Sequence, residues 1–285
     1  MGMGRVGVAA PSDNAAITLN PGLLGLRERY DFHAHFRLGP AGPAPRGEVG
    51  GGLGLQWAAS AMDARTSSAV ALGFAYSGDR FDAPLADRDL PGWWIPGEEI
   101  TNRKRYQDFA GGLAIPLLDR HLSVGLGGDV GLYDHDRQGE GLFWDLHLGV
   151  GLQPTEGLTL GLSARDLLPG DGEDRPMQLL AGLRAEDQGN LAFEINAGHT
   201  WVDAASPLSL RAGLEKILGH AELRLGGGWS GPEGQTYATA GIGTSDEGGG
   251  LEYGVAVPLS PDPSPGALLH QISIRFGAPA PIDPL

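Results

Sequence analysis

The chain of 285 residues carries 35 acidic and 20 basic residues, which gives a formal net charge of −15. It lacks the excess of positive charge that binding to nucleic acid or to an anionic membrane surface needs, so we expect no nucleic-acid partner. Charged residues make up 19% of the chain, below the roughly 25% of an ordinary soluble domain. No run of about 18 apolar residues occurs, which excludes a transmembrane helix but not membrane strands, in which only every second residue must be apolar.

The first 26 residues are apolar and rich in small side chains, yet they follow neither a helical nor a strand period. The rest of the chain alternates between strand-like stretches and turns, and its 48 glycines and 21 prolines are spread along it rather than gathered in a linker. A non-periodic segment followed by many alternating strands predicts a closed wall with the segment held inside it.

Three runs near the start of the chain resemble a known pattern. They are Gly2-Met3-Gly4 followed by Val8-Ala9, the run Ser12-Asp13-Asn14-Ala15-Ala16, and the run Asn20-Pro21-Gly22-Leu23-Leu24. Together they are similar to the N-terminal hatch of the FadL family of outer-membrane transporters, whose members typically show a DDAS…NPA pattern there. Gly22 stands where that family usually has alanine, and the chain is much shorter than typical fatty-acid transporters.

The resemblance implies a hatch at residues 1–28 whose movement opens a path from an outer hydrophobic site. The hatch residues that it implies are Asp13, Asn14, Asn20 and Pro21.

The clearest strand pattern runs from residue 29 to residue 38. Its apolar face consists of Tyr30, Phe32, Ala34, Phe36 and Leu38, and its polar face of Arg29, Asp31, His33, His35 and Arg37. Similar alternation recurs as far as Phe276 and predicts about fourteen strands of about nine to eleven residues, the length of a tilted strand that crosses a membrane. The predicted connections alternate between short polar turns and longer loops, which is typical of outer-membrane barrels.

We therefore predict an all-β fold, a transmembrane antiparallel β-barrel of about fourteen strands. The barrel spans residues 29–276, the hatch (1–28) lies inside its lumen, and a proline-rich tail follows at 277–285.

The apolar positions of the predicted strands are mostly Leu, Val, Ile, Phe, Ala, Trp and Tyr, whereas the polar positions carry both signs of charge. So many large apolar side chains facing water would promote aggregation, but facing lipid they are required. We therefore place the apolar face outside, and a soluble β-sandwich or solenoid is the alternative. The predicted polar network of the lumen comprises Asp31, His33, His35, Arg37, Asp145, His147, Arg165, Arg211, Glu222 and Arg224.

Two arrangements of polar residues bear on chemistry. Five side chains of metal-binding types would converge inside a barrel: His33, His35, Asp129, Asp145 and His147. We favour a hydrogen-bonded network over a metal site, because His-x-His on one strand is common and the other residues lie on different strands, and we predict no metal and no cofactor. The nearest approach to a hydrolase triad is His199, Thr200 and Asp203. No nucleophile elbow or oxyanion signature accompanies it, so we expect no enzyme.

The longest predicted loop, residues 78–103, is rich in apolar side chains on a backbone stiffened by proline. Exposed aromatic residues on such a loop can capture hydrophobic ligands, or they can anchor the loop among lipid headgroups. The candidate ligand-binding residues are Phe81, Leu85, Leu90, Trp93, Trp94 and Ile95.

Two hypotheses about function follow. The first is FadL-like passive transport of small hydrophobic compounds, implied by the hatch resemblance. The second is a non-transporting PorV-like barrel that acts as a scaffold or shuttle in an outer-membrane secretion or motility complex, suggested by the compact size and the charged lumen. Either hypothesis places the protein in the outer membrane of a Gram-negative bacterium, with outer-membrane lipid, a hydrophobic small molecule or envelope-complex proteins as partners. No signal peptide begins the chain, and we expect upstream residues that the sequence does not include.

Overall fold

The computed structural model describes residues 7–10, 14–26, 29–40, 53–64, 69–84, 101–135, 139–168, 176–187, 190–201, 207–231, 235–246, 249–259 and 268–279. Its strands are β1 (Arg29–Pro40), β2 (Leu53–Asp63), β3 (Ala71–Pro84), β4 (Thr101–Leu117), β5 (Leu122–His135), β6 (Gly139–Thr155), β7 (Leu158–Arg165), β8 (Gln178–Asp187), β9 (Leu191–Thr200), β10 (Leu208–Leu218), β11 (Ala221–Ser230), β12 (Gln235–Asp246), β13 (Gly249–Pro258) and β14 (Leu269–Pro279). Two short helices, α1 (Ala16–Leu19) and the 3₁₀ helix η1 (Pro21–Gly25), precede them. Over these residues, no helix combines the length and the apolar character needed to cross a lipid bilayer.

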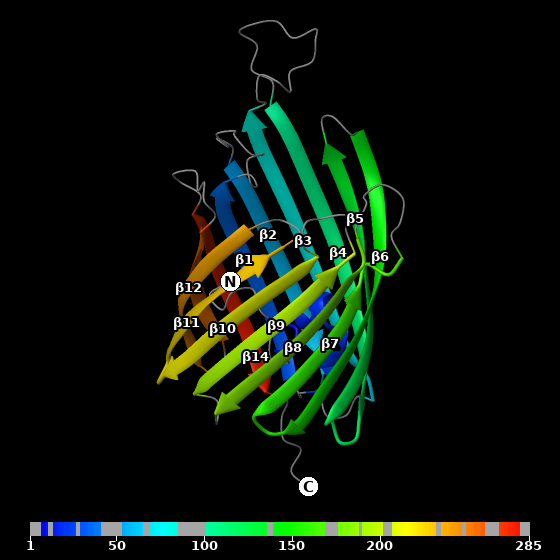
Figure 1. Ribbon diagram of the computed structural model, residues 1–285, viewed down its shortest axis with the longest axis vertical. Helices are drawn as coiled ribbons and strands as arrows, with labels where there is room; N and C mark the ends of the chain where they lie inside the picture. Colours follow the sequence, from blue (N-terminus) through cyan, green and yellow to red (C-terminus); the bar gives the residue numbers. More distant parts are fainter. Residues whose placement is uncertain are drawn as a thin grey trace, which may run out of the picture.

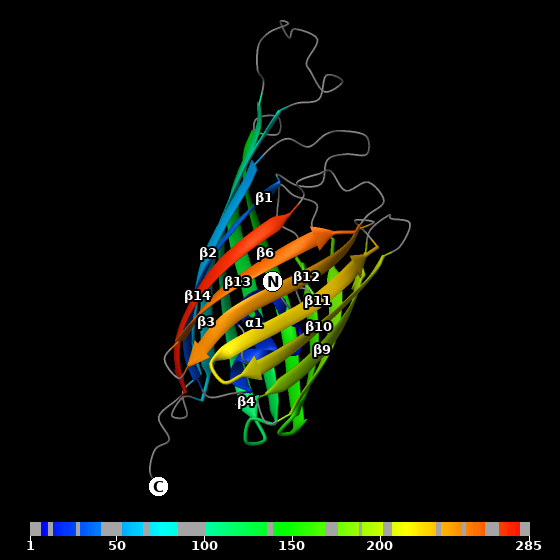
Figure 2. The same ribbon diagram turned by 90° about the vertical axis from the view of Figure 1, so that its left-hand side faces the viewer.

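The fourteen strands close into a single antiparallel barrel (Figure 1). Each strand pairs with its neighbours in the sequence, and β1 completes the ring by pairing with β14 from Arg29↔Pro279 to Leu38↔His270. The strands are steeply tilted against the long axis (Figure 2), as closure of a barrel requires. The predicted fold class and the count of fourteen strands are therefore confirmed.

Strand length departs from the predicted value of about nine to eleven residues. β4 and β6 each have 17 residues, whereas β7 has 8. The predicted loop 78–103 is shorter than expected, because β3 continues to Pro84 and pairs there with Thr101. Backbone hydrogen bonds can extend a hairpin beyond the residues that face lipid. The alternation of apolar and polar residues therefore ends before the paired strands do. Likewise β14 continues past Phe276 to Pro279, so the first residues of the predicted tail pair with β1 in the barrel.

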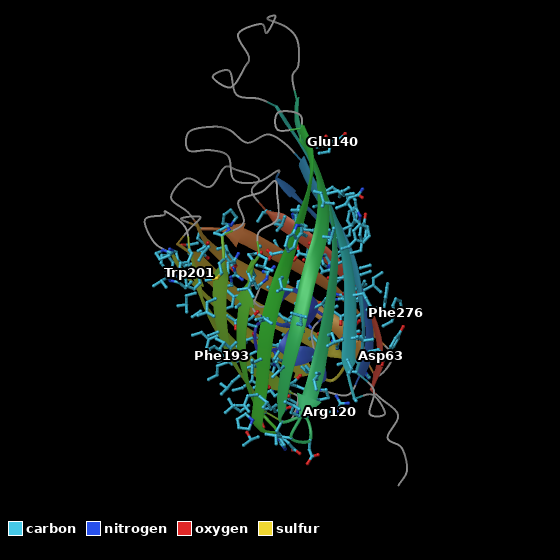
Figure 3. All side chains as sticks on the ribbon, turned by 90° about the vertical axis from the view of Figure 1, so that its right-hand side faces the viewer. Asp63, Arg120, Glu140, Phe193, Trp201 and Phe276 are labelled. Carbon is cyan, nitrogen blue, oxygen red and sulfur yellow. The ribbon has the colours of Figure 1, made fainter. Side chains whose placement is uncertain are left out.

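The outer surface of the barrel is apolar. Large side chains at outward positions are strongly exposed, among them Phe74 (65%), Leu225 (60%) and Ile242 (56%). Phe193 and Phe276 also point away from the wall (Figure 3). The predicted outward placement of the apolar face is therefore confirmed. Alternation with a period of two separates the two faces, and the exposed side chains show which face is outside.

The hydrophobic core lies inside the ring, where the N-terminal segment meets the wall (Figures 1 and 2). The segment contributes Ala16, Ile17, Leu23, Leu24 and Leu26, and the wall contributes Met62, Ala64, Ala71, Ala110 and Ala114. These side chains are almost fully buried, so the interior is apolar at this contact and polar over much of the remaining inward surface.

Candidate functional site

The first part of the candidate site is the plug segment, a name that we give to residues 7–10 and 14–26. Asn20 precedes η1, and its side chain caps the turn by accepting a hydrogen bond from Gly22 N at 3.2 Å. Pro21 starts η1 because the first helical turn needs no backbone donor from that residue. The Asn-Pro-Gly sequence therefore folds this part of the segment locally.

Both helices of the plug segment lie inside the barrel against the wall formed by β3 to β7. Asn20 is fully buried, and its Nδ2 donates to Val8 O (2.9 Å) and to Val150 O on β6 (3.2 Å). This one side chain joins the two parts of the plug segment to each other and to the wall. Since its donors and its acceptor all have partners, its burial carries no unpaired polar group.

Further hydrogen bonds attach the plug segment around the ring. They are Asn14 Nδ2 to Ser60 Oγ on β2 (3.0 Å), Ala9 N to Glu194 Oε1 on β9 (3.1 Å), and Arg120 Nη1, from the turn between β4 and β5, to Gly25 O (3.0 Å). Of the predicted hatch residues, Asn14, Asn20 and Pro21 thus lie in the plug segment, and Asp13 lies outside the described residues.

The wall that faces the plug segment is lined with glycine. A Cβ added to Gly149 on β6 would lie 2.6 Å from Gly22 N, and one added to Gly125 on β5 would lie 2.5 Å from the same atom. Backbone therefore meets backbone, which a side chain would prevent. The other inward glycines whose added Cβ would meet the plug segment are Gly73, Gly112, Gly127, Gly151, Gly161 and Gly182. The sequence analysis missed this surface, although glycines at alternate positions on the polar faces of neighbouring strands are the signal that reveals it.

Ion pairs line the other part of the wall, from β8 to β13. Arg224 pairs with Glu215 (2.6 Å), Glu252 (2.6 Å) and Glu222. Arg184 pairs with Glu186 (3.2 Å), Glu215 (3.5 Å) and Glu194 (3.7 Å). Glu215 joins the two sets into one network, in which each arginine offsets the burial of several carboxylates.

A second polar group spans β1 and β14. Arg275 Nε donates to Asp31 Oδ2 at 3.2 Å, and Arg37 Nη2 donates to Gln271 Oε1 at 3.2 Å. Of the predicted polar residues of the lumen, Asp31 and Arg37 belong to this group, whereas Glu222 and Arg224 belong to the ion pairs of β8 to β13. The structure thus distributes these residues among separate groups rather than one network.

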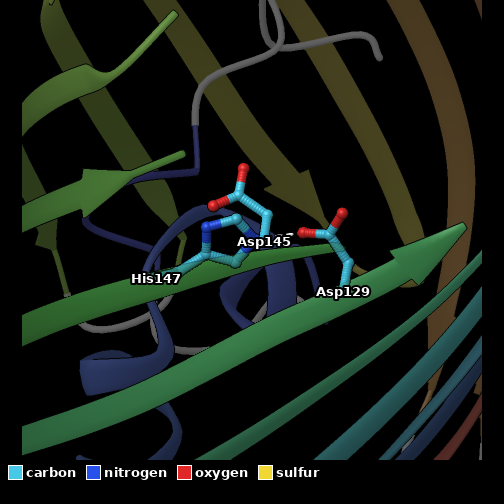
Figure 4. A group of neighbouring side chains, drawn as sticks. All are labelled: Asp129, Asp145 and His147. Carbon is cyan, nitrogen blue, oxygen red and sulfur yellow. Dashed lines mark hydrogen bonds and ion pairs between the residues drawn. The ribbon is translucent and has the colours of Figure 1, made fainter. Parts of the chain in front are cut away.

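A third group is a buried cluster on β5 and β6 (Figure 4). Asp129 and Asp145 lie directly opposite each other in the strand pair and are each 4% exposed, and His147 beside them is fully buried. His147 Nε2 is hydrogen-bonded to Asp129 Oδ1. The structure therefore unites three of the five predicted metal-type residues. His33 and His35 lie on β1, from which β2 to β4 separate the cluster.

Asp166, which follows the end of β7, completes this cluster and was not predicted to belong to a site. Its backbone N donates to His147 Nδ1 at 3.4 Å, and its Oδ2 accepts from Gln178 Nε2 at 3.1 Å. Burial, and then a hydrogen bond with Asp145, raise the pKa of Asp166 from 3.8 to about 7, while the positive charge of Arg165 acts in the opposite direction. Alternation of apolar and polar residues does not reveal which side chains Asp166 meets after the end of β7.

The predicted apolar ligand site lies mostly outside the described residues. Phe81 is part of β3, where its backbone pairs with Lys104, but its side chain is not described. The residues outside the described ranges are Leu85, Leu90, Trp93, Trp94 and Ile95. Among the described residues, a small cavity of about 10 Å³ is lined by Arg224, Gly241, Glu252, Tyr253, Gly254, Gln271 and Ser273. This lining is polar, unlike that of most sites for apolar ligands.

The structure is a closed ring of fourteen strands with an apolar exterior and an interior that holds the plug segment and many polar groups. No protein-family model and no curated protein matches the sequence. Among solved structures, the chain is similar to the CymD monoaromatic hydrocarbon channel, with a TM-score of 0.64 and 12% identity over 97% of this chain and 94% of that chain. It is also similar to the Pseudomonas putida toluene transporter TodX, with a TM-score of 0.62 and 10% identity over 96% of each chain. These likenesses show a shared barrel fold over nearly the whole length, as the sequence resemblance predicted.

Proposed function

We propose that the protein is a channel in the outer membrane of a Gram-negative bacterium that passes small hydrophobic compounds passively. The observation that carries the proposal is a fold shared, over nearly the whole chain, with the CymD monoaromatic hydrocarbon channel and the toluene transporter TodX. The apolar exterior supports contact with lipid. Passive passage involves no chemical step, so the proposal requires neither a catalytic group nor a cofactor.

In this proposal the plug segment is the gate. It occupies the interior against β3 to β7, so a solute that follows this side of the barrel passes only when the segment shifts. Hydrogen bonds such as that from Asn14 to Ser60 can be exchanged for bonds to water when it moves. At the glycines of the wall, the moving segment meets no side chain that it would have to displace.

A disulfide between the plug segment and β3 tests this gate, and the chain has no cysteine of its own. A Cβ added to Gly73 would lie 2.6 Å from Ile17 Cγ1, which is one bond from Ile17 Cβ. The two Cβ atoms of the double variant Ile17→Cys/Gly73→Cys are therefore at most about 4.1 Å apart, within the range of disulfides. The matched control is Ile17→Cys/Gly73→Ser, which has nearly the same side-chain volumes and cannot form the bond.

The assay is uptake of radiolabelled toluene by Gram-negative cells that lack their own importers for aromatic hydrocarbons. We expect the wild-type chain to raise uptake above that of cells with an empty vector. Oxidation should abolish this increment in the double variant but not in the control, and a reducing agent should restore it. Uptake equal to the empty vector would contradict the transport proposal, and uptake unaffected by oxidation would contradict the gate alone.

A scaffold role is the second candidate, and the ion-pair network favours it. Arg184 and Arg224 hold carboxylates along β8 to β13, and so charged a wall is not needed to conduct apolar solutes. Mild crosslinking in the native cell followed by purification tests this role. A stoichiometric envelope protein bound to a barrel that takes up no toluene would support the scaffold over the channel.

A further inference from the structure

The buried cluster on β5 and β6 contains a carboxylate oxygen that the polypeptide leaves unpaired. Asp145 Oδ1 accepts a hydrogen bond from Leu146 N, but Asp145 Oδ2 has no hydrogen-bond donor among the residues that the structure describes. Asp145 is only 4% exposed, so this oxygen has lost most of its contact with water. A buried carboxylate oxygen without a nitrogen or hydroxyl donor is costly, so it needs either a proton shared with Asp166 or a bound cation.

The surroundings of this oxygen concentrate negative charge. Asp129 lies directly across the strand pair from Asp145, and the carboxyl group of Asp166 lies within hydrogen-bonding reach of Asp145. Carboxyl groups this close repel one another unless a proton or a cation lies between them. His147 adds an imidazole, which is a ligand for transition metals rather than for calcium or magnesium.

We propose that Asp129, Asp145 and His147 bind a divalent transition-metal ion of the zinc type. Each of these residues offers one ligand atom, and these atoms all lie within 4.8 Å of one another (Figure 4). Ligands about 2.0–2.2 Å from a tetrahedral zinc ion lie roughly 3.5 Å apart. Small side-chain rotations bring the three atoms to that spacing, because all three come from one rigid strand pair. The two carboxylates of Asp129 and Asp145 match the charge of the ion.

The metal would lie in the wall where strand pairing changes. The pairing of β6 with β7 begins at Leu148↔Ala164, so β6 extends beyond the last described pair while β7 ends at Arg165. Asp166 is the next residue and lies against His147 on β6. An ion bound by Asp129, Asp145 and His147 would therefore lie beside the end of β7.

Metal binding to the full, tag-free chain tests the proposal. The protein is purified in detergent, stripped with a chelator and titrated with Zn²⁺ in competition with a chromogenic chelator, and bound zinc is counted by elemental mass spectrometry. We expect one ion per chain. Co²⁺ in the same site should give the visible absorption bands of a tetrahedral ion with nitrogen and oxygen ligands.

Two variants remove ligands without changing the volume of the core much. Asp145→Asn and His147→Gln should each lower the affinity for Zn²⁺ by about 100-fold or more. Asp145→Asn also removes a repelling charge, so its barrel should fold as well as the wild type. Asp31→Asn is the matched control, because Asp31 is an equally buried aspartate that pairs with Arg275 on β14, away from the cluster. Heat-modifiable migration on gels reports whether each barrel is folded.

Either of two results would overturn the proposal. In the first, the folded wild-type chain binds no more zinc than folded Asp145→Asn, which means that a shared proton satisfies the carboxyl groups. In the second, Asp31→Asn loses the ion as completely as His147→Gln does, which means that the zinc binds elsewhere. One ion per chain, lost in both cluster variants and kept in the control, supports the site.

Discussion

Replacing Asn20 by alanine should release the plug segment while leaving the barrel closed. Asn20 is fully buried and makes three hydrogen bonds, to Val8 O, to Val150 O and from Gly22 N. Only the bond to Val150 O reaches the wall, but so short a segment keeps its two internal bonds only while it is docked. At about 1 kcal/mol of net stabilisation for each bond, the substitution therefore weakens docking by about 3 kcal/mol. Because every 1.4 kcal/mol is a factor of ten, the population with the segment undocked rises about 100-fold. The backbone hydrogen bonds between the strands of the barrel do not involve the Asn20 side chain, so the barrel itself should stay folded.

The rate of thiol labelling measures this population, because the chain has no cysteine to give background. Ala16→Cys places a thiol at a fully buried position of the plug segment, where a maleimide reacts only after the segment undocks. We expect labelling to be about 100-fold faster in Ala16→Cys/Asn20→Ala than in Ala16→Cys alone. Adding Asn190→Ala instead, in the exposed turn before β9, should leave the rate unchanged. A rate that Asn20→Ala changes by less than about threefold would refute the view that these hydrogen bonds hold the segment in place.

Three further predictions concern the wall. Gly149→Ala should destabilise docking of the plug segment by about 1–3 kcal/mol, because the added Cβ meets the segment's backbone. Gly111→Ala, on the outer face, should leave docking unchanged, and thiol labelling compares the two variants. Arg224→Met should lower the free energy of unfolding by about 3–5 kcal/mol in denaturant titrations, because it leaves several inward carboxylates without their shared cation. Leu225→Arg, on the lipid-facing surface, should destabilise the barrel in bilayers by about 2–4 kcal/mol. Leu118→Arg, in a turn, should cost only about 0–1 kcal/mol, and folding titrations in lipid vesicles measure both.

The wall of the barrel could be predicted because its chemistry repeats at every second residue. Alternation such as that of Tyr30, Phe32 and Phe36 against Asp31 and Arg37 assigns each side chain to a face without knowledge of the partner strand. Strand ends could not be predicted in the same way. β4 and β6 extend beyond the alternating region through backbone pairing, which leaves no mark on side-chain type.

The candidate site could be predicted only in part, because its groups come from several strands. Asp129 and Asp145 pair across the β5–β6 hairpin, so the position of that hairpin was enough to bring them together. Asp166 joins them from just after the end of β7; the sequence predicts a strand end there, but not which side chains of β6 it meets. His33 carries the same type of side chain but lies four strands away from β5, which sequence spacing alone could not reveal.

The interior is divided, and the division bears on the path of a solute. The plug segment packs on the glycine-lined surface of β3 to β7, whereas the ion pairs of Arg184 and Arg224 lie on β8 to β13. Ion-paired side chains offer an apolar solute a strongly polar contact. A glycine-lined surface, together with residues such as Ala110 and Ala114, offers it a weakly polar one. Under the proposed transport function, the surface that an apolar solute follows is therefore the one that the plug segment covers. Access to it then depends on how tightly Asn20 and its neighbours hold that segment against the wall.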